Sequence, residues 1–162
     1  MIKMSEVKLF KDNTYNFNYC QENEQYNNRK GILRGLHYQI EPYAQAKLVQ
    51  VVKGEVLSVA VDIRKNSNTY GSYVSYKLDD IKQKRMYIPK GFAHGYITLS
   101  NQSIFIYQVD EYFNLDSMKG IAFDNKDLNI DWETSENEII VSDKDLKNKQ
   151  FKHVIPYRES YE

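Results

Sequence analysis

The chain has 162 residues, and its 22 Lys and Arg side chains balance 22 Asp and Glu side chains. The length predicts one domain with a sizeable core, and the balanced charge excludes a general attraction to nucleic acid or anionic membranes. The single cysteine, Cys20, excludes an intramolecular disulfide framework and fits a reducing compartment. No apolar run reaches the length of a membrane span, and the N-terminus lacks the apolar core of a signal peptide. We therefore expect a cytoplasmic protein with no membrane and no nucleic-acid partner.

The predicted elements begin with a polar segment. Residues 1–30 are rich in Asn, Glu, Gln and Lys, which predicts a peripheral strand or arm outside the core. Two β-branched runs follow at 47–52 and 55–62, and the Lys53-Gly54 link between them predicts a hairpin. Further strands are expected at 73–78, 85–88, 95–99 and 103–109, most of them bounded by Gly, Pro, Asn or Asp.

The end of the chain is charged and contains few elements. A final strand is expected at 139–141 and a short helix near 143–149, whereas the tail from Phe151 is expected to fray or to pack on a partner subunit. Strands that recur about every ten residues, without a sustained helical period, indicate an antiparallel sandwich or barrel. We predict a single all-β domain with an arm at 1–30, a barrel at 31–150 and a tail at 151–162.

The segment 31–39 carries the most informative pattern. It contains Arg34 and His37, and Lys47 follows ten residues after that histidine. A histidine that carries protons beside fixed cations suits chemistry in which negative charge develops on an oxygen, so an enzyme is the leading hypothesis. Strand alternation places Arg34 and His37 on opposite faces unless Gly35 introduces a bulge. A structural histidine is the alternative interpretation.

A second histidine, His94, lies in the pattern Pro-x-Gly-x-x-His at 89–94. This pattern resembles the second motif of the cupin superfamily, in which the histidine often binds a metal together with a His-x-His pair and a glutamate. The His-x-His pair is missing here, because Tyr38 and Gln39 follow His37, and the third histidine of the chain, His153, lies near the C-terminus. We therefore expect a pocket without a metal, with a structural histidine as the alternative for His94.

The chain from residue 31 to about residue 147 resembles the dTDP-4-dehydrorhamnose 3,5-epimerase family of cupins. The matching blocks follow the family's order and spacing: Leu33-Arg34-Gly35-Leu36-His37-Tyr38-Gln39, Gln45-Ala46-Lys47-Leu48-Val49, Gly54-Glu55-Val56, 59–65, 88–95, 127–132 and 142–145. The resemblance implies a cupin-type jelly-roll β-barrel that forms a homodimer. It also implies epimerisation at C3, C5 or both of a nucleotide-linked 4-keto-6-deoxy sugar, with no cofactor and no metal.

The resemblance also implies roles for individual residues. His37 is expected to be the general base, oriented by Asp145, and Tyr107 the acid that returns a proton on the opposite face of the sugar ring. Lys47 is expected to stabilise the enolate oxygen. The expected substrate-binding residues are Arg34 and His94 near the sugar or diphosphate, Lys144 and Tyr112 on the nucleotide side, and Gln21 and Asn23. Without the resemblance, Asp145 has the pattern of a solvated turn residue and Tyr107 that of a core aromatic.

Two departures from the family pattern keep alternatives open. Residues 1–28 contain no match to the Asp-x-Arg-Gly-x-Phe-x-Glu stretch that helps to hold the nucleotide across the family's dimer interface, and Phe113 replaces the second tyrosine of a Tyr-Tyr pair. One alternative is an epimerase that acts at a single carbon or on another nucleotide keto sugar. The others are a sugar-nucleotide 3,4-ketoisomerase, which usually keeps a His-x-His pair, and a non-catalytic cupin that binds sugar nucleotides.

Overall fold

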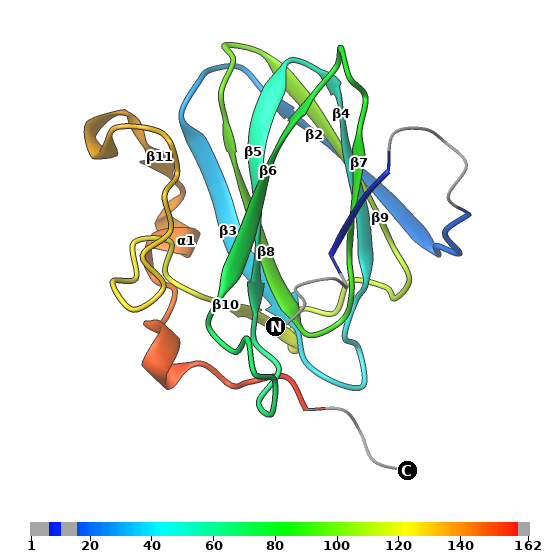
Figure 1. The fold of residues 1–162 in the computed structure, drawn as a ribbon, viewed down its shortest axis with the longest axis vertical. Helices are drawn as coiled ribbons and strands as arrows, with labels where there is room; N and C mark the ends of the chain where they lie inside the picture. The colour runs from blue at the N-terminus through cyan, green and yellow to red at the C-terminus, as the bar shows by residue number, and fades with distance from the viewer. Residues whose placement is uncertain (1–6, 11–15, 159–162) are drawn as a thin grey trace.

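A computed structural model of the chain describes residues 7–10 and 16–158, which form two β-sheets facing each other (Figure 1). The five-stranded sheet contains, in spatial order, β1 (Lys8–Phe10), β7 (Arg85–Ile88), β4 (Lys47–Lys53), β9 (Ser103–Val109) and β2 (Gln21–Asn27). The other sheet contains β10 (Met118–Gly120), β3 (Ile32–Gln39), β8 (Phe92–Thr98), β5 (Glu55–Asp62) and β6 (Tyr73–Asp79), with β11 (Ile140–Val141) parallel to β3. The other strand pairs are antiparallel, which confirms the predicted all-β jelly-roll class.

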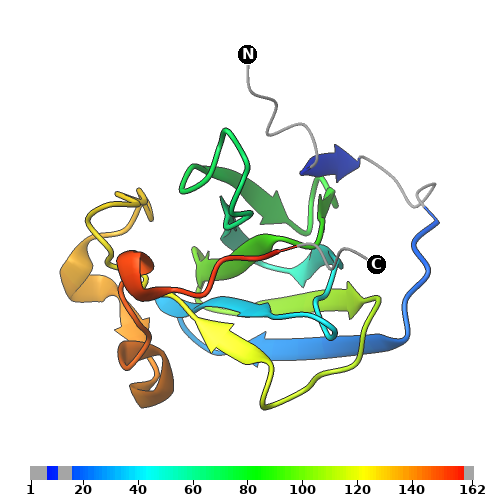
Figure 2. The same cartoon turned by 90° about the horizontal axis from the view of Figure 1, so that it is seen from below.

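The chain after β10 adds short helical segments instead of further long strands. These are η1 (Glu136–Glu138), α1 (Asp143–Leu146) and η2 (Phe151–His153). In both views the orange part of this chain, with β11 and α1, lies on one side of the barrel, next to β3, and the red part runs from there beneath the sheets (Figures 1 and 2). Among the described residues, no helix has the length and apolar character needed to cross a membrane.

The expected hairpin at Lys53-Gly54 is wrong. Its two runs do form β4 and β5, but β4 pairs with β7 and β9, whereas β5 pairs with β6 and β8 in the other sheet. Gly54 has φ +78°, and a Cβ there would lie 2.1 Å from the carbonyl oxygen of Gln102. The glycine therefore carries the chain across from one sheet to the other, and a short glycine link serves that crossing as well as it serves a hairpin.

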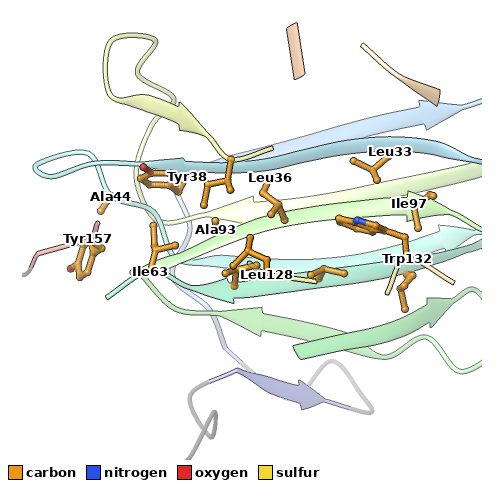
Figure 3. Packing of buried hydrophobic residues seen from close by; sticks show 14 residues of the cluster. Leu33, Leu36, Tyr38, Ala44, Ile63, Ala93, Ile97, Leu128, Trp132 and Tyr157 are labelled. Atoms are coloured by element: carbon orange, nitrogen blue, oxygen red, sulfur yellow. The ribbon is translucent and has the colours of Figure 1, made fainter. Parts of the chain in front are cut away.

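Burial on both faces of β5 explains its continuous apolar sequence. One set of side chains, including Val56 and Ala60, faces the interior between the sheets. The alternate set, including Val59 and Val61, belongs to a second cluster that the chain after β10 covers. Figure 3 shows this second cluster, in which Leu33, Leu36 and Ile97 from the sheet lie with Leu128, Trp132 and Tyr157 from the cover.

The described part of the tail packs on its own subunit. The amide of Tyr157 donates to the carbonyl of Ile63 at 2.8 Å, and its hydroxyl donates to Glu41 Oε1 at 2.9 Å. The ring of Tyr157 belongs to the outer apolar cluster. The segment up to residue 158 is therefore not frayed, and its packing on a partner subunit stays a prediction; residues 159–162 lie outside the described residues.

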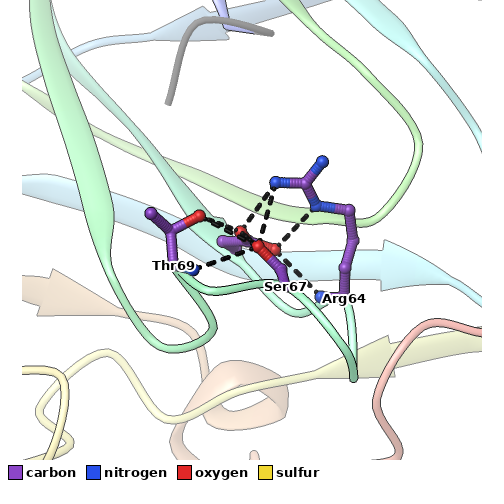
Figure 4. A network of polar contacts seen from close by, with 4 residues as sticks. Arg64, Ser67 and Thr69 are labelled. Carbon is purple, nitrogen blue, oxygen red and sulfur yellow. Dashed lines mark hydrogen bonds and ion pairs between the residues drawn. The ribbon is translucent and has the colours of Figure 1, made fainter. Parts of the chain in front are cut away.

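A buried carboxylate holds the loop that follows β5. Asp62 accepts hydrogen bonds from the guanidinium of Arg64 and the hydroxyls of Ser67 and Thr69 (Figure 4). Burial favours a higher pKa for Asp62, but these hydrogen bonds outweigh it and hold the pKa below its usual value. The guanidinium of Arg64 also lies 4.8 Å from the ring centroid of Phe92, so the network supports the first residue of β8, the strand that carries the second histidine.

Replacing Asp62 with asparagine is expected to lower the free energy of unfolding by roughly 3 kcal/mol at neutral pH, because it removes the ion pair between a fully buried carboxylate and the guanidinium of Arg64. The folded carboxyl has a depressed pKa, so its stabilisation is present at neutral pH and is lost as the pH falls through that pKa. Urea unfolding at neutral pH and at about pH 3 should show the difference between wild type and variant shrink. The exposed Asp124, replaced in the same way, provides the control. Equal unfolding midpoints for wild type and Asp62→Asn at neutral pH would contradict this assignment.

Candidate active site

A cavity of about 650 Å³ opens between the two sheets. Among the residues expected from the sequence, those that line it are Gln21, Asn23, Arg34, His37, Lys47, His94, Tyr107, Lys144 and Asp145. Tyr112 is not among the lining residues: its side chain is exposed, and its main-chain carbonyl accepts a hydrogen bond from Gln39 Nε2 at 3.1 Å. The neighbouring Phe113 lines the cavity. The fold thus gathers the expected residues from several strands and from the segment that carries α1.

A bulge in β3 places Arg34 and His37 in the same cavity. Arg34 pairs with Tyr96 of β8, and the register then shifts before His37 pairs with His94. Gly35 lies at the shift with φ +118°, and a Cβ there would lie 2.7 Å from the Cα atom of Gly95. Only glycine fits such close strand contact at this backbone conformation. The sequence predicted that Arg34 and His37 could share a face only if Gly35 introduced a bulge, and the bulge is confirmed.

The imidazole of His37 forms a pair with the carboxylate of Asp145. Its Nε2 atom lies 2.5 Å from Asp145 Oδ1, and Asp145 Oδ2 accepts a hydrogen bond from the amide of Gly35 at 3.1 Å. Burial favours a higher pKa for Asp145, but hydrogen bonds from His37, Gly35 and Asn148 hold the pKa below its usual value. An ionised carboxylate only accepts hydrogen bonds, so Nε2 of His37 carries the hydrogen, and in the neutral imidazole Nδ1 is then the nitrogen with the lone pair.

A helix cap fixes the position of Asp145. Ser142 caps α1, and its hydroxyl oxygen accepts from the amide of Asp145 at 3.2 Å. This arrangement is typical of a helix N-terminus and satisfies an amide that has no partner within the helix. β11 precedes the cap and runs beside β3, with Val141 opposite Leu33. The pairing of β11 with β3 thus brings a carboxylate more than a hundred residues away in sequence to His37.

The second histidine is buried and uncharged. His94 Nε2 lies 2.9 Å from the hydroxyl of Ser58, which is fully buried on the neighbouring strand β5. Burial, and then repulsion from the charge of Lys47 and from that of His37 when it is protonated, lower the pKa of His94 well below its usual value. His94 therefore faces the cavity as a neutral hydrogen-bonding group. Within residues 7–10 and 16–158, no three His, Cys, Asp or Glu side chains form a group that could hold a metal ion.

The five-stranded sheet contributes a cation and a phenol to the opposite wall of the cavity. Lys47 of β4 borders the cavity, where burial lowers the pKa of its ammonium to about 8. Its Nζ lies 6.0 Å from the ring centroid of Tyr107 on β9. Burial raises the pKa of Tyr107, although Arg34 acts in the opposite direction, so the phenol keeps its proton at neutral pH. His37 and Tyr107 thus face one cavity from different sheets.

Sequence reasoning missed a set of polar residues that lie in or beside this cavity. Gln25 and Tyr96 line it, and Asn27 lies buried behind them. Residues 21, 23, 25 and 27 of β2 are all Gln or Asn at alternate positions, which is the period of one strand face. That alternation was the available signal, but the polar composition of residues 1–30 favoured a peripheral arm instead.

Comparisons with known proteins agree with this geometry. A sequence model of the family described as dTDP-4-dehydrorhamnose 3,5-epimerase matches residues 2–153. A relative of that name from Shigella flexneri is 45% identical over 122 residues, which cover 75% of this chain and 66% of the relative, so the chain spans about two thirds of its length.

Solved structures agree as well. The dTDP-4-dehydrorhamnose 3,5-epimerase of Elizabethkingia anophelis NUHP1 superposes with a TM-score of 0.83 at 36% identity, covering 91% of this chain and 89% of the other. An epimerase of Legionella pneumophila, solved in complex with dTDP-4-keto-L-rhamnose, gives a TM-score of 0.83 at 33% identity, with 96% and 92% coverage. Fold, sequence and solved relatives lead to the same assignment: this chain belongs to the dTDP-4-dehydrorhamnose 3,5-epimerase family.

Proposed function

We propose that this protein epimerises C3, C5 or both of a nucleotide-linked 4-keto-6-deoxy sugar, by removing a proton on one face of the ring and returning one on the other. The observation that carries the proposal is the placement of His37 and Tyr107, which face one cavity from opposite sheets. The Legionella pneumophila relative binds a sugar of this class. The cavity, at about 650 Å³, has the size of a small-molecule site.

The first step is proton removal by His37. A proton on a carbon beside a ketone is only weakly acidic, so the negative charge that develops on the ketone oxygen must be stabilised as the proton leaves. Nδ1 of His37 takes the proton, and Asp145 stabilises the imidazolium that forms through its contact with Nε2. The ammonium of Lys47 faces the oxygen, where one such donor contributes on the order of 3 kcal/mol.

The second step inverts the carbon. The phenol of Tyr107 donates its proton to the enolate carbon from the face opposite His37, and the ketone re-forms. Burial keeps this phenol protonated until it is used. Solvent then returns a proton to the Tyr107 oxygen and removes one from His37. Because the ketone activates both neighbouring carbons, the same pair of residues serves C3 and C5.

The polar residues at the rim are assigned to the rest of the substrate. Arg34 and His94 are proposed to contact the sugar or diphosphate, and Lys144 the nucleotide. Gln21 and Asn23 of β2 form a hydrogen-bonded amide pair, with Gln21 Nε2 3.0 Å from Asn23 Oδ1. Both line the cavity from the five-stranded sheet and are proposed to contact the substrate there. The role for Tyr112 on the nucleotide side stays a prediction.

We further propose that the protein acts as a homodimer in the cytoplasm. The outer face of the five-stranded sheet carries apolar side chains that water reaches, including Tyr26 and Val52, and it continues through the partly exposed Ile104 and Ile106 of β9. Several exposed apolar side chains on one sheet face are a feature of subunit interfaces. Light scattering after size exclusion should give twice the chain mass, and a monomer at micromolar concentration would contradict the dimer.

The pH dependence of the reaction should report Lys47. Its pKa of about 8 means that the ammonium loses its proton as the pH rises through that value. The ketone oxygen of the substrate then has no cation beside it to stabilise its developing charge. The ratio kcat/KM for proton exchange is therefore expected to fall above about pH 8. In Lys47→Arg the residual activity should fall only at higher pH, because a guanidinium keeps its proton. The exposed Lys53, changed to arginine, is the control. A fall at the same pH in wild type and Lys47→Arg would assign it to another group.

The proposed activity is tested by incubating the protein in heavy water with dTDP-linked and GDP-linked 4-keto-6-deoxy sugars and following C3 and C5 by NMR. Deuterium at both carbons with inverted configuration supports a double epimerase, and deuterium at one carbon supports a single-centre enzyme. Binding of these compounds without any exchange would show that the protein is not an epimerase. Comparison of the two nucleotides identifies which base and sugar it accepts.

A further inference from the structure

Asn27 is a buried amide at the end of β2 that contacts a cation of the active site. Its exposed fraction is only 1%. Its Oδ1 atom lies 3.0 Å from Arg34 Nε, and its Nδ2 atom lies 3.2 Å from the hydroxyl of Tyr96 and 3.3 Å from that of Ser103. Asn27 thus joins a strand of the five-stranded sheet to both Arg34 and Tyr96 of the six-stranded sheet.

The chemistry of Arg34 fixes the direction of the hydrogen bonds that Asn27 makes. Arg34 Nε only donates, so the oxygen of Asn27 must face it and the amide NH₂ must face the two hydroxyls. The phenol of Tyr96 accepts a hydrogen bond from Asn27 and donates one to Gln25 Oε1 at 2.7 Å. The phenol of Tyr96 is therefore committed within the network, and the guanidinium of Arg34 is held at Nε.

The acceptor that holds Arg34 carries no charge. In the part of the chain that the structure describes, Arg34 forms no ion pair with a carboxylate, although it lines the cavity. Arg34 is partly buried, and guanidinium groups that are removed from water are usually paired with carboxylates. A carboxylate here would offset the charge of Arg34. A neutral amide orients the guanidinium and leaves its positive charge to act on whatever enters the cavity.

We propose that Asn27 is a positioning residue, which fixes the guanidinium of Arg34 while keeping its charge available for the negative charge of the nucleotide-linked substrate. This inference rests on the proposed function, because the anion that Arg34 meets is that of the substrate or of its enolate. Substitution at position 27 can change the charge of the side chain without changing its size. Aspartate has nearly the same shape as asparagine, still accepts from Arg34, and can accept from both hydroxyls.

The test compares Asn27→Asp with Asn27→Ala. A purely structural role predicts that Asn27→Asp retains more activity than Asn27→Ala, since it preserves the shape and the contact with Arg34. The proposed role predicts the reverse order: Asn27→Asp should unfold at the higher temperature yet lose at least about tenfold more kcat/KM for proton exchange, the size of effect that one paired charge has on binding. The exposed Asn101, changed to aspartate, controls for the added negative charge.

A double-mutant comparison gives the same answer without the aspartate variant. If Asn27 acts through Arg34, Asn27→Ala should lower kcat/KM markedly in the wild-type background and less than about twofold in Arg34→Gln. An equal loss in both backgrounds, or an Asn27→Asp variant at least as active as Asn27→Ala, overturns the inference. Absence of exchange in the wild-type protein would instead reject the proposed function, so the two failures are distinguishable.

Discussion

Replacing His37 with alanine is expected to slow deuterium exchange by roughly 10³-fold, the usual contribution of a positioned general base. The substitution removes the nitrogen that takes the proton and leaves the ketone without a base on that side. The carboxylate of Asp145 cannot replace it, because its oxygens are held by Gly35 and Asn148 as well as by His37. NMR exchange rates at C3 and C5 provide the measurement.

The fold is expected to survive this change. His37 side-chain atoms are partly exposed to the cavity, with an exposed fraction of 29%, so little packing is lost. Circular dichroism and the thermal midpoint should therefore stay close to those of the wild type. His153, exposed on the short helix η2, gives a matched His→Ala control with normal exchange. Near-normal turnover in His37→Ala would refute the assignment of the base.

Replacing Tyr107 with phenylalanine should separate exchange from inversion. His37 can still remove and return a proton on its own face, so deuterium should continue to enter the substrate. The opposite-face donor is lost, and net epimerisation is expected to fall by roughly 10²-fold or more. Parallel measurement of isotope content and product configuration in one NMR time course shows both rates.

Tyr43→Phe provides the control for the loss of a tyrosine hydroxyl. The side chain of Tyr43 is exposed and does not line the cavity, so both rates should stay normal. Equal loss of exchange and inversion in Tyr107→Phe would count against its role as the second proton donor. The other two tyrosines that line the cavity, Tyr38 and Tyr96, are not expected to substitute, since their hydroxyls donate to the carbonyl of Ile155 and to Gln25 Oε1.

Local patterns in the sequence predicted much of the barrel. The expected strands at 85–88 and 103–109 have the same bounds as β7 and β9, because turn residues and alternating apolar positions define such strands locally. The expected strand at 95–99 was too short, since β8 begins at Phe92. Which strands pair is a property of the folded chain, and the wrong hairpin at Lys53-Gly54 shows that a turn sequence alone does not reveal it.

The residues of the candidate site could be predicted where they match the motifs of the family. No local signal links Asp145 with His37, which are 108 residues apart, and only the resemblance joined them. Conversely, Gln25 and Asn27 lay in a segment whose polar composition predicted an arm. Their function depends on what the opposite sheet presents to them, above all Arg34 and Tyr96. The sequence of β2 alone does not reveal which residues of the opposite sheet it contacts.

A crystal structure of the protein with a bound dTDP-linked 4-keto-6-deoxy sugar or an unreactive analogue tests the central claim most directly. The pyranose is predicted to lie between the sheets, with Nδ1 of His37 near C3 or C5 on one face and the hydroxyl of Tyr107 on the other. The ammonium of Lys47 should lie within hydrogen-bond distance of the ketone oxygen. A sugar bound with both side chains on the same face, or outside this cavity, would contradict the mechanism.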